Sequence, residues 1–68
     1  MIAGTRESVI EKTQKHIHEA QETIDGWKNE LEIAKRKKDE KYKRYCEVMI
    51  QIFEEELQRL QNALKEFE

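Results

Sequence analysis

The sequence of 68 residues contains no proline, two glycines, one cysteine and two histidines. An all-β fold needs turn residues about every 8–12 positions, so this scarcity excludes it. A lone cysteine excludes an internal disulfide, and we expect a cytoplasmic protein. No apolar run approaches the roughly 18 residues of a membrane span, and charged residues follow the first four too closely for a signal peptide. We therefore predict one domain, residues 1–68, without a membrane partner.

Charged residues make up 41% of the chain and hydrophobic residues 37%, which fits either disorder or amphipathic helices. The spacing of the apolar residues favours helices, because two runs alternate between intervals of three and four and each therefore covers one helix face. We call the residues of both runs the seam. The first run is Ile10, Thr13, Ile17, Ala20, Ile24, Trp27, Leu31 and Ala34. The second run is Cys46, Ile50, Phe53, Leu57, Leu60, Leu64 and Phe67.

The segment between the two runs, residues 35–41, contains no apolar side chain. In an antiparallel helix pair, the numbers of facing seam residues have a constant sum. One register satisfies this rule for all seven layers, from Ile10 with Phe67 to Leu31 with Cys46. Its turn is centred between Lys38 and Asp39, inside the polar segment, so the register favours a chain that folds back.

We therefore predict an all-α fold, a two-helix antiparallel coiled-coil hairpin. The helices cover about residues 5–36 and 40–67, with the turn at about 37–40. Thr5 and Asp39 are suitable N-cap residues for the two helices. On one edge of the hairpin, this register places Lys28 opposite Glu54 and Lys35 opposite Glu47. The structural alternative is one straight helix in a long dimeric coiled coil.

A second apolar stripe lies beside the seam on the second helix. It consists of Tyr42, Tyr45, Met49 and Ile52, with Val48 next to it. A solvent-exposed helix normally has a narrower apolar stripe, and an isolated hairpin of this size has only a marginal core. We therefore predict a homodimer in which these four residues form the self-interface, as a four-helix bundle of two hairpins.

Basic residues are concentrated around the predicted turn. We define the basic tip as Lys35, Arg36, Lys37, Lys38, Lys41, Lys43 and Arg44. Seven basic and two acidic residues give segment 35–44 a net charge of +5. Residues 1–34 have four basic and seven acidic residues (−3), and residues 45–68 have two and six (−4). This layout predicts a docking point for an acidic partner.

No set of residues predicts catalysis or a cofactor. His16 and His18 lie two positions apart and point to different faces of a helix, so they cannot hold one metal ion together. Cys46 lies on the seam, where cysteines act as small hydrophobic residues. Gly26 interrupts the first helix on its outer face, where it allows a bend or the close approach of another helix. We predict no catalytic residues, no metal and no cofactor.

These observations predict a non-enzymatic protein that binds macromolecules, namely itself and another protein, as an adaptor, regulator or inhibitor. The alternative is a nucleic-acid-binding regulatory hairpin that uses the basic tip, with Tyr42 and Tyr45 stacking on bases. The net charge of −2 argues against this alternative, since nucleic-acid-binding domains are usually basic.

Overall fold

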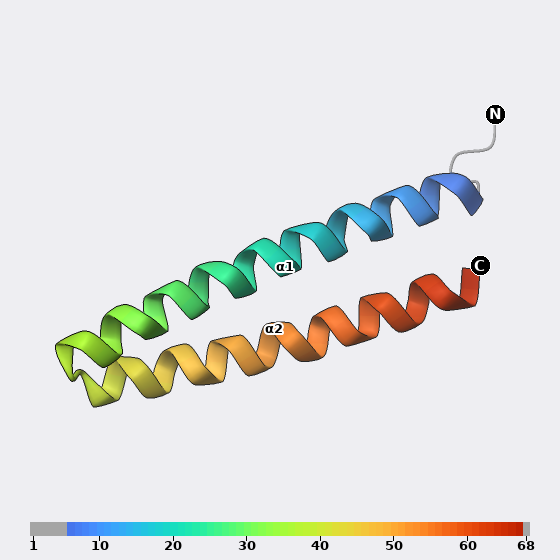
Figure 1. Ribbon diagram of the computed structural model, residues 1–68. Helices are drawn as coiled ribbons and strands as arrows, with labels where there is room; N and C mark the ends of the chain where they lie inside the picture. Colours follow the sequence, from blue (N-terminus) through green and yellow to red (C-terminus); the bar gives the residue numbers. More distant parts are fainter. Residues whose placement is uncertain (1–5, 68) are drawn as a thin grey trace.

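The chain forms two long helices that pack side by side in opposite directions (Figure 1). The computed structural model describes residues 6–67, with helix α1 at Arg6–Lys37 and helix α2 at Glu40–Phe67. Arg6 and Phe67 lie at the same end of a rod with dimensions of 55 × 17 × 14 Å. The structure confirms the predicted helical hairpin, and the alternative of one straight helix is wrong.

Both helices are rich in residues with high helix propensity, mainly Glu, Lys, Gln, Leu and Arg. Gly26 is the only glycine among residues 6–67, and in the middle of α1 it costs about 1 kcal/mol relative to alanine. Basic residues in the last turn of α1 and Glu40 in the first turn of α2 oppose the partial charges of the helix ends. Neither helix has a stretch long and apolar enough to cross a membrane.

The chain reverses in a loop of two residues, Lys38 and Asp39. Lys38 has a φ of 58°, in the left-handed region. Its N–H donates to the carbonyl oxygen of Lys35 at 3.2 Å, and the Asp39 N–H donates to that of Ala34 at 3.0 Å. These two bonds form a Schellman motif, which ends a helix and usually has glycine at the left-handed position. Lysine takes the place of glycine here, which explains a turn without one.

Asp39 also begins α2. Its Oδ1 accepts a hydrogen bond from the backbone N–H of Tyr42 at 3.1 Å, and its carbonyl oxygen accepts one from Lys43 at 2.9 Å. The first of these bonds satisfies a backbone donor that has no partner within the helix. Asp39 is therefore the N-cap of α2, as predicted. Thr5, the predicted cap of the first helix, lies outside the described residues.

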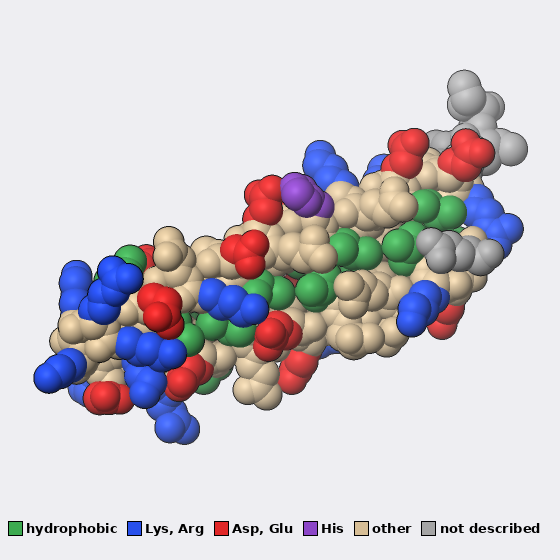
Figure 2. All heavy atoms as spheres, in the orientation of Figure 1, with side chains coloured by type: hydrophobic (Ala, Val, Ile, Leu, Met, Phe, Trp, Pro, Cys, Tyr) green, Lys and Arg blue, Asp and Glu red, His purple; other side chains and the backbone are tan. Residues whose placement is uncertain are grey.

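The core is a single row of seam side chains between the helices, seen as a hydrophobic stripe along the rod in Figure 2. Four seam residues are buried, namely Ala20, Ile24, Ala34 and Cys46. The other seam residues are half-buried, except Phe67, which is 38% exposed. Two helices alone enclose few larger side chains, and Ile24 is the one large aliphatic side chain that is buried among residues 6–67, so much of the seam stays in contact with solvent.

The predicted ion pairs across the hairpin edge are not formed. Lys35 Nζ lies 3.3 Å from Glu32 Oε2 of its own helix instead of pairing with Glu47, and Lys28 does not pair with Glu54. Within residues 6–67, every ion pair joins two residues of the same helix. Exposed Lys and Glu side chains reach a partner one turn away more readily than one on a neighbouring helix. Burial of the seam therefore holds the helices together.

Candidate interaction surfaces

The basic tip surrounds the loop, and Figure 2 shows its Lys and Arg side chains spread over that end of the rod. All seven of its side chains are exposed except that of Lys43, which is half-buried. Lys35 pairs with Glu32 at 3.3 Å, and Lys43 with Glu40 at 3.9 Å. The remaining five form no ion pair with any residue from 6 to 67: Arg36, Lys37, Lys38, Lys41 and Arg44.

The loop holds these cations in a defined arrangement. Two Schellman bonds and the Asp39 cap fix the backbone between the end of α1 and the start of α2. The Asp39 carboxylate accepts a hydrogen bond from the Tyr42 N–H and forms no ion pair with a tip cation among residues 6–67. The arrangement therefore suits an anionic surface that approaches the loop end of the rod.

Tyr42 and Tyr45 form an aromatic cluster with Trp27 at the side of the hairpin. The Trp27 and Tyr45 rings meet edge to face, with centroids 5.5 Å apart, and the Tyr42 and Tyr45 rings stack at 6.3 Å. The Tyr42 hydroxyl donates to Glu30 Oε1 at 3.4 Å. Desolvation, followed by the negative charge of Glu30, raises the pKa of Tyr42, which favours the protonated hydroxyl that donates this bond. These contacts hold both rings against the hairpin, although Tyr45 remains 52% exposed.

The predicted self-interface is partly exposed in the hairpin. Tyr45 is 52% exposed and Ile52 49% exposed, whereas Tyr42 and Met49 are half-buried. The neighbouring Val48 is 47% exposed, and Ile33 of α1 is also exposed. We call the four predicted residues Tyr42, Tyr45, Met49 and Ile52 the apolar face. Exposed aliphatic and aromatic side chains that cluster in this way are typical of association surfaces.

Two hollows lie along the hairpin, and Thr23 lines both. The larger, of about 510 Å³, is lined by Thr23, Gly26, Trp27, Asn29 and Glu30 of α1, and we call it the Gly26 groove. The smaller, of about 260 Å³, lies further from the loop and is lined by His16, Glu19, Ala20, Thr23, Phe53, Glu56 and Leu60. Sequence reasoning did not predict these hollows, although it had singled out Gly26, one of the residues that line the larger one.

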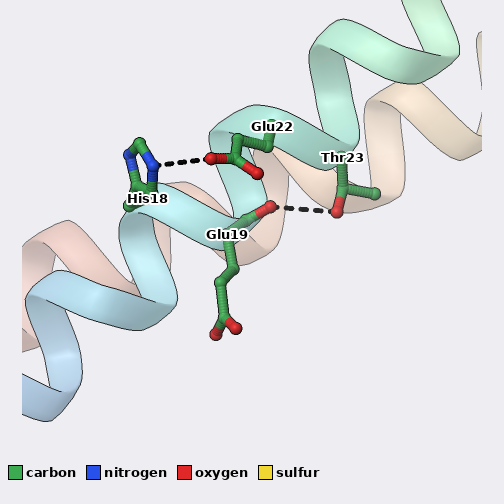
Figure 3. A network of polar contacts seen from close by, with 4 residues as sticks. All are labelled: His18, Glu19, Glu22 and Thr23. Carbon is green, nitrogen blue, oxygen red and sulfur yellow. Dashed lines mark hydrogen bonds and ion pairs between the residues drawn. The ribbon is translucent and has the colours of Figure 1, made fainter.

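The residues capable of catalysis or metal binding are scattered. His18 Nε2 lies 2.6 Å from Glu22 Oε1 on the exposed surface of α1, while Thr23 bonds back to the Glu19 carbonyl oxygen in the next turn (Figure 3). Cys46 is fully buried on the seam. Among residues 6–67, no group of three His, Cys, Asp or Glu side chains is placed to hold a metal ion.

No protein-family model matches this sequence, and no curated protein or solved structure is significantly similar to it. The fold and its surfaces define a small helical hairpin with a cationic end and an apolar side. Since a fold does not determine a function, the functional argument rests on these surfaces.

Proposed function

We propose that this protein is a non-enzymatic interaction module, a homodimeric helical hairpin that acts as an adaptor, regulator or inhibitor. Its basic tip binds an acidic surface of another protein. The observation that carries this proposal is the set of five tip cations without an ion pair within residues 6–67, arranged around a hydrogen-bonded loop. Cations held on a fixed backbone lose less conformational freedom on binding than those on a mobile tail.

A protein partner fits the charge layout better than a nucleic acid. The acidic run Glu54, Glu55 and Glu56 lies on α2 and repels a polyanion laid along the rod. Tyr42 is half-buried and its hydroxyl is bonded to Glu30, so it is poorly placed to stack on a base. Tyr45 belongs to the apolar face that a second hairpin would cover. A compact acidic surface that meets only the end of the rod avoids this repulsion.

The homodimer is supported by the apolar face. Only four side chains are buried among the described residues, while Tyr45, Val48 and Ile52 remain about half exposed. Covering these side chains with a second hairpin removes apolar surface from water, at about 25 cal/mol per Å². The opposite side of the hairpin offers no comparable surface, because Lys28, Lys35 and Glu47 are exposed there.

Reversal of charge at the tip tests the proposal. The variant carries Lys41→Glu and Arg44→Glu, and the matched control carries Lys15→Glu and Lys65→Glu, which change the same charges away from the tip. Fluorescence anisotropy measures binding to a glutamate-rich peptide, a single-stranded RNA and a DNA duplex, each across a salt series. We expect the tip variant to lose roughly tenfold or more of its peptide affinity, and the control to retain it.

Two outcomes would contradict this proposal. Absence of peptide binding by the unmodified protein, or equal binding by the tip variant, would remove the acidic-surface role. Tighter binding to RNA or DNA, with a steep salt dependence that the tip variant abolishes, would replace it with the nucleic-acid function. Circular dichroism confirms that each variant remains helical.

A further inference from the structure

The apolar face has the same spacing in both directions along α2. Its four residues follow one another at intervals of three, four and three, so the midpoint of the pattern lies at the level of residue 47. Most of the uncovered apolar surface near the loop also belongs to this helix. Among residues 6–67, α2 exposes Tyr45, Val48 and Ile52 there, whereas α1 exposes only Ile33.

This symmetry allows the apolar face to pack against an identical copy of itself. Tyr42 and Ile52 lie equally far on either side of residue 47, as do Tyr45 and Met49. A two-fold axis at this level, with the two α2 helices antiparallel, therefore gives all four side chains an apolar partner on the second copy. Val48, which is 47% exposed, lies next to the axis and meets its own counterpart.

We propose that a second copy of this chain covers the apolar face, with α2 packed antiparallel on α2 and the two-fold axis at the level of residue 47. This inference rests on the homodimer proposed above and specifies its geometry. The loop lies only about 12 Å from the axis, so the two copies overlap in their loop halves alone. Two rods of 55 Å that share about 25 Å of their length form a dimer about 85 Å long.

Charges beside the apolar face favour this orientation. Lys41 lies about 9 Å from the level of the axis towards the loop, and Glu55 lies about 12 Å from it towards the chain ends. Intervals of seven place both residues on the same edge of the apolar face as Val48. The two-fold rotation therefore brings Lys41 of each copy beside Glu55 of the other. Both side chains are exposed, and neither forms an ion pair with any residue from 6 to 67.

Other two-fold arrangements bring like charges together. A parallel pairing of the α2 helices would place two tip segments side by side, each with seven basic and two acidic residues. A contact between the two α1 helices is also unfavourable. In the seam register Glu30 lies at the level of the axis, so two carboxylates would meet there. The α1 helices therefore stay outside the contact.

Small-angle scattering and sedimentation equilibrium test this geometry. We expect a dimer with a maximum dimension of about 85 Å, against about 55 Å for two hairpins that overlap completely. Ile52→Gln should weaken the dimer by roughly tenfold or more, whereas Ile33→Gln, the same change at an exposed site of α1, should leave it unchanged. Circular dichroism checks that both variants keep the helix content of the unmodified chain.

Reversal of single charges tests the orientation. Lys41→Glu and Glu55→Lys should each weaken the dimer, because each change brings like charges together, and the double variant should restore it. In a parallel pair these residues would face their own counterparts, so a single reversal would leave the repulsion as it was. Arg44 lies on the solvent side of α2, outside the contact. Arg44→Glu should therefore leave the dimer intact while it lowers the affinity for the glutamate-rich peptide.

The outcomes separate this geometry from the proposed function. A dimer of about 55 Å, or one that resists Ile52→Gln or both single charge reversals, would overturn the geometry and leave a homodimer in place. A chain that stays monomeric at millimolar concentration would overturn the homodimer, and this inference with it. A dimer of about 85 Å that does not bind the peptide would support the geometry and overturn only the acidic-surface role.

Discussion

The half of the hairpin next to the loop and the half next to the chain ends follow one heptad pattern but differ in packing. Near the loop, Ala34 and Cys46 are 1% and 0% exposed, while Ile10 and Leu64 at the other end are only half-buried. The ribbons in Figure 1 also lie closer together at the loop. Small side chains allow the backbones to approach, so complete burial between two helices comes from small residues near the connection.

The surfaces of the two halves differ as well. The loop half carries the basic tip and the apolar face, whereas the other half has the carboxylates of Glu19 and Glu56 around the smaller hollow. Both proposed binding surfaces therefore lie on the part of the hairpin with the tightest core. A tightly packed segment presents its exposed side chains in a fixed arrangement, which lowers the entropy lost on binding.

The largest expected effect on stability comes from truncating a seam side chain, and it should depend on how deeply that side chain is buried. Ile24→Ala removes a buried side chain that lies nearer the loop than Ile10 does, and it should lower the free energy of unfolding by about 3 kcal/mol. Ile10→Ala removes the same atoms from a half-buried site and should cost only about 1 kcal/mol. Urea unfolding followed by circular dichroism measures both. Equal losses would show that the two halves are packed alike.

Overpacking should reveal the close approach of the helices near the loop. Ala34→Leu forces a larger side chain into a fully buried site and should destabilise the hairpin by about 2 kcal/mol. Ala63→Leu makes the same change at an exposed site in the other half and should change stability by no more than about 0.5 kcal/mol. Thermal unfolding compares the pair, and a harmless Ala34→Leu would contradict the tight contact.

Removal of the cap of α2 should have a smaller effect. Asp39→Ala abolishes the bond from the Tyr42 N–H and should cost about 1 kcal/mol, whereas Asp39→Asn should retain most of the stability. Asp25→Ala, an exposed change within α1, serves as the control and should not destabilise the chain. Chemical unfolding of the three variants checks whether the carboxylate acts as a cap.

Substitution of Lys38, the loop residue with a positive φ, should increase stability instead of lowering it. Lys38→Gly should stabilise the hairpin by roughly 0.5–1 kcal/mol, because glycine adopts the left-handed conformation without steric cost. Lys37→Gly, one residue earlier inside α1, should lower stability by about 1 kcal/mol. Melting temperatures of the two variants should therefore move apart. Destabilisation by both would mean that Lys38 is not left-handed in solution.

The smallest expected effect is the pH dependence arising from Tyr42. Its pKa is raised in the folded chain by desolvation and by Glu30, so the folded state holds this proton more tightly than the unfolded state. The resulting stability is fully present below the ordinary tyrosine pKa of about 10 and is lost as the pH rises through the raised value. Ultraviolet absorbance of tyrosinate tracks this ionisation. Tyr42→Phe should remove the part of the absorbance change that comes from Tyr42. It should also make the free energy of unfolding less dependent on pH in the alkaline range.

The spacing of apolar residues and the residues suited to helix ends were sufficient to predict the hairpin. Seam periodicity identified both helices, and the requirement that facing residues share one register placed the turn at Lys38 and Asp39. These features depend on residues a few positions apart and on one pairing rule, so they can be read from the order of residues. The cap at Asp39 followed for the same reason, because a cap bonds to a neighbour three residues away.

The remaining features depend on how the two helices approach each other. The Tyr42–Glu30 bond, the Trp27–Tyr45 contact and the Gly26 groove each require the distance between helix axes and the direction of individual side chains. The preference of Lys35 for Glu32 over Glu47 likewise reflects the shorter reach along one helix. Periodicity specifies which face of a helix is buried. The depth of burial, and the residues that meet at the edges, follow from the packing of the complete hairpin.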